Sequence, residues 1–212
     1  MPPIHIVVTA GPTREHLDPV RFLSNPSTGK MGYAIAQAAA RRGHRVTLIS
    51  GPVDLPLPSG TKTIQVTTAA EMAKATKQAF READAAVLTA AVCDYRPRRQ
   101  ARQKLAKKAR PKSIVLVPTE DIAAALGRNK GRRITIAFAL EDHNGRANAE
   151  RKMRRKNCDA IVLNGPDNVG SDRARVALLL RGARWQSWGA DTKPRIAERL
   201  LKTLESIVKK QH

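Results

Sequence analysis

The sequence is poor in aromatic residues, which make up 3% of its 212 residues. With so few rings available, the hydrophobic core must be built mainly from alanine, valine, isoleucine and leucine. The same shortage argues against a binder of single-stranded nucleic acid, because such proteins stack bases on aromatic side chains. Hydrophobic residues still account for 42% of the chain, so the composition is that of a globular protein with a sizeable core.

Cysteine is equally scarce, and the two that occur, Cys93 and Cys158, lie far apart. They form neither a CxxC pair nor a zinc-ligand spacing, which excludes a disulfide framework and a cysteine-based metal site. No histidine lies near either thiol in the sequence, so we interpret both as small buried apolar residues rather than nucleophiles. This usage predicts a reducing compartment.

Long apolar runs are missing as well. No stretch reaches the length of a membrane-spanning helix, and residues 1–3 lead into a predicted strand without the apolar segment of a signal peptide. We therefore expect a cytoplasmic protein that makes no membrane contact. The chain also lacks internal repeats and disordered linkers, so we expect a single domain over residues 1–212.

Acidic residues are outnumbered by basic ones, since 18 Asp and Glu stand against 39 Lys and Arg to give a net charge of +21. The basic residues are densest in residues 96–112, which contain no acid, and in a second run at residues 151–156. Such segments occur on solvated surfaces, bind nucleic acid nonspecifically, or neutralise a polyphosphate substrate.

The strongest functional pattern is residues 8–32, VTAGPTREHLDPVRFLSNPSTGKMG. A β-branched run at residues 4–8 predicts a buried strand, and apolar residues after Lys30 repeat with a helical period. The polar loop between them is longer than most strand-to-helix connections, which favours a functional site. The amides of such a helix N-terminus attract an anion. Neither a Walker A loop nor a GxGxxG motif occurs here, and an ordinary connection capped by Ser27 is the alternative.

Strands alternate with helices along the chain, which predicts an α/β protein whose mostly parallel sheet has helices on both faces. Thr68 and Glu71 predict a capping box, and Thr119 is expected to cap the next helix.

Ligands of such sheets bind beyond the carboxyl ends of the strands, so residues 9–32, residues 90–97 and the strand containing Phe138 should share one crevice. The basic segment of about residues 96–113 is expected to close over it as a flap. Strands are predicted at residues 4–8, 45–50, 63–67, 85–89, 114–117, 134–140 and 160–163, a hairpin at 176–188, and helices at 27–43, 68–82, 119–127, 146–156 and 192–209.

Four separately spaced motifs carry a resemblance: residues 9–32, SGPVDLP at 50–56, AAVCDYRP at 90–97, and the lysine cluster at 104–108. Together they resemble the phosphopantothenate–cysteine ligase family, the synthetase part of the coenzyme A biosynthesis flavoproteins. The resemblance covers residues 4–163 in order and implies a Rossmann-like sheet with a small hairpin or flap extension, and a homodimer. It is weak beyond Asn164, which leaves a divergent hairpin and helix at about residues 164–209.

The resemblance implies a two-step reaction with CTP and Mg²⁺. The carboxylate of 4'-phosphopantothenate displaces pyrophosphate to form an acyl-cytidylate, and the amine of cysteine then displaces CMP. That carboxylate is ionised at neutral pH, so the first step needs neutralisation of pyrophosphate by Mg²⁺ and lysines rather than a general base. No flavin and no fused decarboxylase are expected, so a separate decarboxylase is the expected pathway partner. An ATP-using variant of the same ligase remains open.

The matched motifs imply roles for individual residues. Lys104, ten residues after Asp94, matches the first-step lysine, with Lys107 and Lys108 as helpers. Asn25 matches the asparagine of the second step, where an amide polarises the acyl carbonyl without adding charge, and Arg21 is a candidate for an oxyanion of the substrate. The implied nucleotide contacts are Gly11, Ser27, Thr28, Gly29 and Lys30 at the phosphates, Asp94 at the ribose or Mg²⁺, and Ala90 and Phe138 beside the cytosine.

Two other function classes fit part of the sequence. A Rossmann enzyme that uses NAD(P) or a nucleotide sugar requires a glycine fingerprint after the first strand and an acid after the second. Ser50, Gly51 and Pro52 follow the second strand instead, and Asp54 comes only later. A basic nucleic-acid-binding module predicts binding that weakens steeply with salt and does not depend on Asn25. We expect nonspecific binding at most.

Overall fold

The computed structural model describes residues 2–107 and 113–211, so the predicted helper Lys108 lies outside the described residues. Within them an eight-stranded sheet has the order β12-β11-β10-β9-β6-β1-β4-β5. The strands from β10 to β5 run parallel, and β11 and β12 add an antiparallel hairpin at one edge. This is the predicted α/β, Rossmann-like sheet. The strands are β1 (His5–Ala10), β4 (Arg45–Ser50), β5 (Lys62–Gln65), β6 (Ala85–Leu88), β9 (Ile134–Leu140), β10 (Ala160–Asn164), β11 (Arg173–Leu180) and β12 (Gln186–Thr192).

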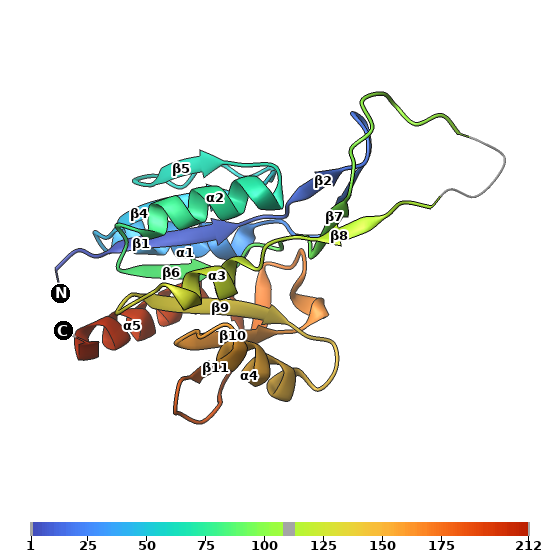
Figure 1. Cartoon of the computed structure of the whole chain (residues 1–212). Helices are drawn as coiled ribbons and strands as arrows, with labels where there is room; N and C mark the ends of the chain where they lie inside the picture. The colour runs from blue at the N-terminus through green and yellow to red at the C-terminus, as the bar shows by residue number, and fades with distance from the viewer. Residues whose placement is uncertain (1, 108–112, 212) are drawn as a thin grey trace.

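Helices cover both faces of the sheet (Figure 1). On one face α1 (Lys30–Arg41) packs beside α5 (Lys193–Gln211). The opposite face carries α2 (Ala69–Phe80), α3 (Ile122–Arg128) and α4 (Gly145–Arg155). None of the helices among the described residues is long and apolar enough to cross a membrane.

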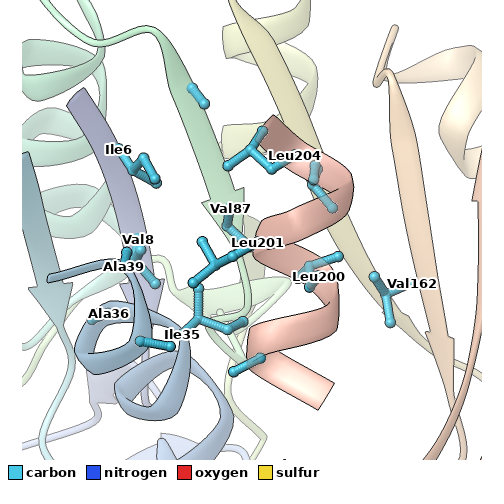
Figure 2. Packing of buried hydrophobic residues seen from close by; sticks show 14 of the residues in the cluster. Ile6, Val8, Ile35, Ala36, Ala39, Val87, Val162, Leu200, Leu201 and Leu204 are labelled. Atoms are coloured by element: carbon cyan, nitrogen blue, oxygen red, sulfur yellow. The ribbon is translucent and has the colours of Figure 1, made fainter. Parts of the chain in front are cut away.

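The contact between α1 and α5 shows how a core is built with few aromatic rings. Ile35, Ala36 and Ala39 of α1 face Leu200 and Leu201 of α5 above the central strands (Figure 2). All five side chains are buried. Alanine on the α1 side lets the two helices and the sheet approach closely, so the leucines of α5 fill the remaining space.

Glu205 joins α5 to the end of α1. Its carboxylate accepts hydrogen bonds from Arg42 Nε at 2.8 Å and Arg42 Nη2 at 2.7 Å, and contacts His44 Nε2 at 2.9 Å. The hydrogen bonds from Arg42, helped by those from His44, outweigh the opposing effect of burial and lower the pKa of Glu205 from 4.5 to about 2. The carboxylate therefore stays ionised in the folded protein.

We expect Glu205→Gln to lower the free energy of unfolding at neutral pH by about 2 kcal/mol, because the amide leaves Arg42 with only its longer contact to Glu198 at 3.7 Å. The folded pKa lies below the ordinary value, so this stabilisation is complete above pH 4.5 and is lost as the pH falls towards 2. Urea unfolding at about pH 7 and about pH 3 measures both effects. The control is Glu150→Gln, whose exposed ion pair with Arg154 is worth about 0.5 kcal/mol or less. Equal losses in the two variants would contradict the prediction.

Most predicted elements agree with the structure to within one to three residues, and the Thr68–Glu71 capping box is present. The predicted Thr119 cap is wrong, and the Ser27 cap of the alternative interpretation does not form either. The hydroxyl of Thr119 donates to the carbonyl of Cys93, and Asp121 caps α3 instead. Ser27 does not cap α1, because that helix begins after Gly29, which has a φ of 74°.

The long loop after β1 contains a hairpin that the sequence pattern did not predict, formed by β2 (Arg14–His16) and β3 (Phe22–Ser24). A second strand pair, β7 (Tyr95–Pro97) and β8 (Leu116–Pro118), lies beside it. Between β7 and β8 runs the segment that we call the basic arm, described at residues 98–107 and 113–115. Figure 1 shows it extending away from the sheet rather than folded back over it as a flap.

Candidate functional site

Two clefts meet at the carboxyl edge of the sheet, where the strand order reverses beside β1. The first, of about 200 Å³, lies at the N-terminus of α1 and reaches the loop between β10 and β11. The second, of about 210 Å³, lies on the other face, against the start of α3. Ala90 and Phe138 line both clefts, so together they form one groove across the edge of the sheet. This is where α/β proteins of this topology bind ligands.

The first cleft is built around the uncapped N-terminus of α1. Gly29 takes a left-handed conformation there, and no side chain in the described part of the chain caps the first-turn amides. Gly32 allows the helix to approach β1 closely, because a Cβ on it would lie 2.5 Å from that of Ala10. Gly11 lies directly behind Gly29, and its carbonyl accepts the amide of Ala91 at 2.9 Å. The exposed amides and the helix dipole make this end of the cleft suitable for an anion.

Two lysines add positive charge to the first cleft. Lys30 Nζ lies 2.6 Å from Asp172 Oδ1, and Lys193 Nζ donates to the carbonyl of Asn168 at 3.2 Å. Burial, with a smaller contribution from the charge of Lys30, lowers the pKa of Lys193. The hydrogen bond from Lys30 lowers the pKa of Asp172. Asp172 is the only acidic residue paired with this group among the described residues, so the cleft keeps a net positive charge.

The second cleft contains Asp94, whose carboxylate is exposed and makes no ion pair within the described part of the chain. The neighbouring acids are engaged: Glu120 pairs with Lys77 at 2.8 Å and Asp121 with Lys156 at 3.2 Å. The described residues contain no group of three or more metal-ligating side chains. A single carboxylate nevertheless suits Mg²⁺ that is carried by nucleotide phosphates, because such an ion needs only one or two protein ligands.

Asn25 connects the start of α1 to the turn that follows β6. Its Nδ2 donates to the carbonyl oxygens of Ala91 at 3.2 Å and Val92 at 3.1 Å. Both amide hydrogens are thus in use, and the carbonyl oxygen of the side chain points away from these two acceptors. In this conformation Asn25 holds two loops of the site together, and a contact from Nδ2 to a substrate carbonyl requires one of these bonds to open.

A third, wider cleft of about 860 Å³ adjoins the first and shares Ser27, Thr28 and Lys30 with it. Its outer wall includes Arg14, whose guanidinium lies 4.7 Å from the centre of the Phe22 ring. The N-terminus of α1 is therefore reached from two sides. This arrangement suits a reaction in which two substrates meet at one phosphate.

The two cysteines lie inside the protein, as predicted. Cys93 is 6% exposed and Cys158 is completely buried. Burial raises the pKa of the Cys93 thiol, and it raises that of Cys158 to about 11. Neither thiol is suited to act as a nucleophile at neutral pH.

The basic arm is held against the β2–β3 hairpin by Asp18, whose side chain is completely buried. The Asp18 carboxylate accepts the amides of Val20 and Arg21 at 2.8 Å and that of Leu105 at 3.1 Å. Burial opposes ionisation of Asp18, but these backbone hydrogen bonds outweigh it and lower its pKa. Arg21 Nη2 also donates to the carbonyl of Leu105 at 2.9 Å. These bonds hold Arg21 against Leu105, the residue that follows Lys104.

Comparison with known proteins places this geometry in a family. The family model described as the DNA/pantothenate metabolism flavoprotein C-terminal domain matches residues 2–208. The chain belongs to this family. Membership confirms the resemblance that the four sequence motifs carry, because that domain is the C-terminal part of the coenzyme A biosynthesis protein CoaBC.

Individual relatives support the assignment. The crystal structure of the C-terminal domain of CoaBC has a TM-score of 0.85 and 37% identity, and the match covers 98% of this chain and 96% of that one. CoaBC of Bacillus subtilis (strain 168) is 45% identical over 161 residues, which cover 76% of this chain and 40% of that protein. A protein named Cysteine/Cysteine sulfinic acid decarboxylase, from an unidentified prokaryote, is 40% identical over 209 residues, covering 96% of this chain and 58% of that protein. The chain thus spans about half the length of these curated relatives.

The residues predicted from the motifs fall into two groups. One group surrounds the groove at the carboxyl edge: Gly11, Asn25, Ser27, Thr28, Gly29, Lys30, Ala90, Asp94 and Phe138. The other, Arg21, Lys104 and Lys107, lies on the hairpin and the basic arm and lines none of the three clefts. Sequence reasoning missed Lys193 and Asp172, because only the β11–β12 hairpin brings them to α1.

Proposed function

We propose that the chain is a phosphopantothenate–cysteine ligase that uses CTP and Mg²⁺ in coenzyme A biosynthesis. Family membership supports the pathway, and the cationic groove at the carboxyl edge of the sheet supports the chemistry. The observation that carries the proposal is the uncapped N-terminus of α1 beside Lys30 and Lys193, joined through Ala90 and Phe138 to the carboxylate of Asp94. A triphosphate fits the first part of this groove, and the ribose and base fit the second.

In the first step the carboxylate of 4'-phosphopantothenate attacks the α-phosphorus of CTP, and pyrophosphate leaves with its electron pair. The third cleft gives phosphopantothenate a route to the same phosphates, since it shares Ser27, Thr28 and Lys30 with the first. The α1 amides and lysines neutralise the charge that develops on pyrophosphate. Mg²⁺, which Asp94 would hold, supplies further charge neutralisation when bound.

In the second step the amine of cysteine attacks the acyl carbon of the acyl-cytidylate, and CMP leaves. Asn25 lies next to the Ser27–Lys30 segment and is fixed by its bonds to Ala91 and Val92. We propose that Nδ2 gives up one of these two hydrogen bonds and donates instead to the acyl carbonyl oxygen as negative charge develops on that oxygen. An amide suits this position because it adds no negative charge beside the phosphates.

We further propose that the protein acts as a homodimer. Large apolar side chains are exposed where the chain extends from the sheet: Val20 between β2 and β3 is 59% exposed, Tyr95 of β7 is 56% and Val115 at the end of the basic arm is 61%. Exposed large apolar side chains on neighbouring segments are typical of an interface between proteins, and β2 lies against β7 here. Pairing of two copies through this region would also explain why Arg21 and Lys104 lie away from the clefts of their own chain, since they can then serve the cleft of the other copy.

The decisive test is pyrophosphate release by the purified protein with 4'-phosphopantothenate, cysteine and Mg²⁺, comparing CTP with ATP. We expect release with CTP that depends on phosphopantothenate, because backbone groups around Ala90 and Phe138 can read the base edge. Release with ATP alone would keep the ligase and overturn the CTP assignment. The absence of release with either nucleotide would overturn the proposed function.

A further inference from the structure

Lys193, the first residue of α5, lies in the first cleft beside the N-terminus of α1. It is 7% exposed, and its Nζ donates one hydrogen bond, to the carbonyl of Asn168 at 3.2 Å. Among the described residues no carboxylate lies within ion-pairing distance of this ammonium. A buried charge without an opposite charge is costly, so its position favours an anion that binds in the cleft.

The helices around Lys193 increase this cost. A lysine at the N-terminus of a helix is opposed by the helix dipole, and the first turn of α5 contains no acidic residue. The first turn of α1 contains none either. Two lysines and the positive end of α1 therefore face one cavity of about 200 Å³. Such an arrangement is unfavourable in the free protein and becomes favourable when a polyanion binds.

Asp172 partly offsets this charge from the mouth of the cleft. It lies on the loop between β10 and β11, its side chain is 84% exposed, and it pairs with Lys30 at 2.6 Å. The amide of Lys193 donates to the carbonyl of Asp172 at 3.0 Å, so the backbone holds the two residues side by side. The Asp172 carboxylate thus forms an ion pair with Lys30, the more exposed of the two lysines.

We propose that Lys193 and Lys30 together bind the terminal phosphates of the nucleotide, and that Asp172 occupies Lys30 until those phosphates displace it. The inference rests on the proposed function, since a triphosphate is the expected polyanion. Lys193 uses one of its three donors on Asn168, which leaves two for phosphate oxygens. Lys30 exchanges the exposed carboxylate of Asp172 for a phosphate, and the same phosphate also accepts hydrogen bonds from the α1 amides. Lys193 is therefore a binding residue for the departing pyrophosphate, and Asp172 is a carboxylate that the phosphates displace from Lys30.

The test is calorimetric titration of the purified protein with inorganic pyrophosphate and with CTP, both in the presence of Mg²⁺. Lys193→Met should weaken the binding of both by about 10-fold or more, because charge-assisted bonds to phosphate are lost. Its thermal stability should stay equal or rise, since a buried charge is replaced by an apolar chain of similar size. Lys193→Arg should retain most of the affinity. Asp172→Asn should tighten pyrophosphate binding several-fold, because the competing carboxylate is removed.

The matched control is Lys202→Met, an exposed lysine on the same helix, which should change neither affinity nor stability. Unchanged pyrophosphate binding by a folded Lys193→Met protein would overturn the role of Lys193. If that variant does not fold, Lys193→Arg and Asp172→Asn decide, and unchanged or weaker binding by Asp172→Asn would overturn the competition. Wild-type protein that binds neither CTP nor pyrophosphate and releases no pyrophosphate would instead contradict the proposed function itself.

Discussion

Replacing Lys104 with glutamine is expected to lower pyrophosphate release with CTP by about 100- to 1,000-fold, the usual cost of removing one charged group from a transition state that separates anions. The side chain remains long and polar, so the loss reports on charge. Lys104 is exposed on the basic arm, and the next residue is bound through its backbone to Asp18 and Arg21. The substitution should therefore leave the fold and the urea midpoint unchanged.

The effect should be confined to the first step. Acyl-cytidylate supplied to the variant should still react with cysteine, and CTP binding should weaken far less than turnover falls. Lys74→Gln, which removes an exposed lysine of α2, is the control and should retain wild-type release. Normal pyrophosphate release by Lys104→Gln would show that the assignment of this lysine is wrong even where the family is right.

The position of the arm adds a second measurement to this prediction. Arg21 and Lys104 line none of the three clefts, whereas Asn25 is hydrogen-bonded to Ala91 and Val92, which line the groove. If the arm serves the other copy of a dimer, mixing Lys104→Gln with Asn25→Asp protein should restore part of the activity, because each mixed dimer has one intact site. Activity that stays at the level of the separate variants would show that each chain uses its own arm.

Replacing Asn25 with aspartate should leave pyrophosphate release measurable but reduce formation of phosphopantothenoylcysteine by about 100-fold or more. The amide now donates to the carbonyls of Ala91 and Val92, and an ionised carboxylate in its place would oppose both oxygens and the phosphates. The acyl-cytidylate should accumulate and be detectable by mass spectrometry after the protein is denatured.

The control separates the loss of the donor from the added charge. Asn25→Ala removes the amide without introducing charge, and it should also slow the second step while disturbing the first less than aspartate does. Ser59, an exposed loop residue far from the groove, offers a neutral comparison as Ser59→Ala. Product formation by Asn25→Asp at the wild-type rate, with no accumulated intermediate, would contradict the assigned step.

Local patterns predicted the main elements because each depends on neighbouring residues. The β-branched run before Ala10 forms β1, the Thr68–Glu71 capping box starts α2, and the turn at Arg181 and Gly182 joins β11 to β12. Alternation of strands with helices predicted the parallel sheet, and that sheet places the end of β1 next to the end of β6. The motifs carried the family resemblance, which the comparisons confirm.

Other features depend on contacts between residues far apart in the sequence. The β2–β3 hairpin consists of short strands with no apolar alternation, and the arm is held to it through the buried Asp18. The lysine pair of the first cleft is a similar case, because Lys30 and Lys193 meet only when α5 packs against α1. No periodicity or local spacing relates such residues.

The sequence by itself determined the class of fold, the family and the residues that surround the start of α1, because strand runs, helix periods and motifs are written in consecutive residues. Only the tertiary structure decided which charges share a cavity. It placed Lys193 and Asp172 beside Lys30, and it set Arg21 and Lys104 apart from the clefts of their own chain. Electrostatic energy depends on distance in space, and the packing of α5 and the course of the basic arm set those distances.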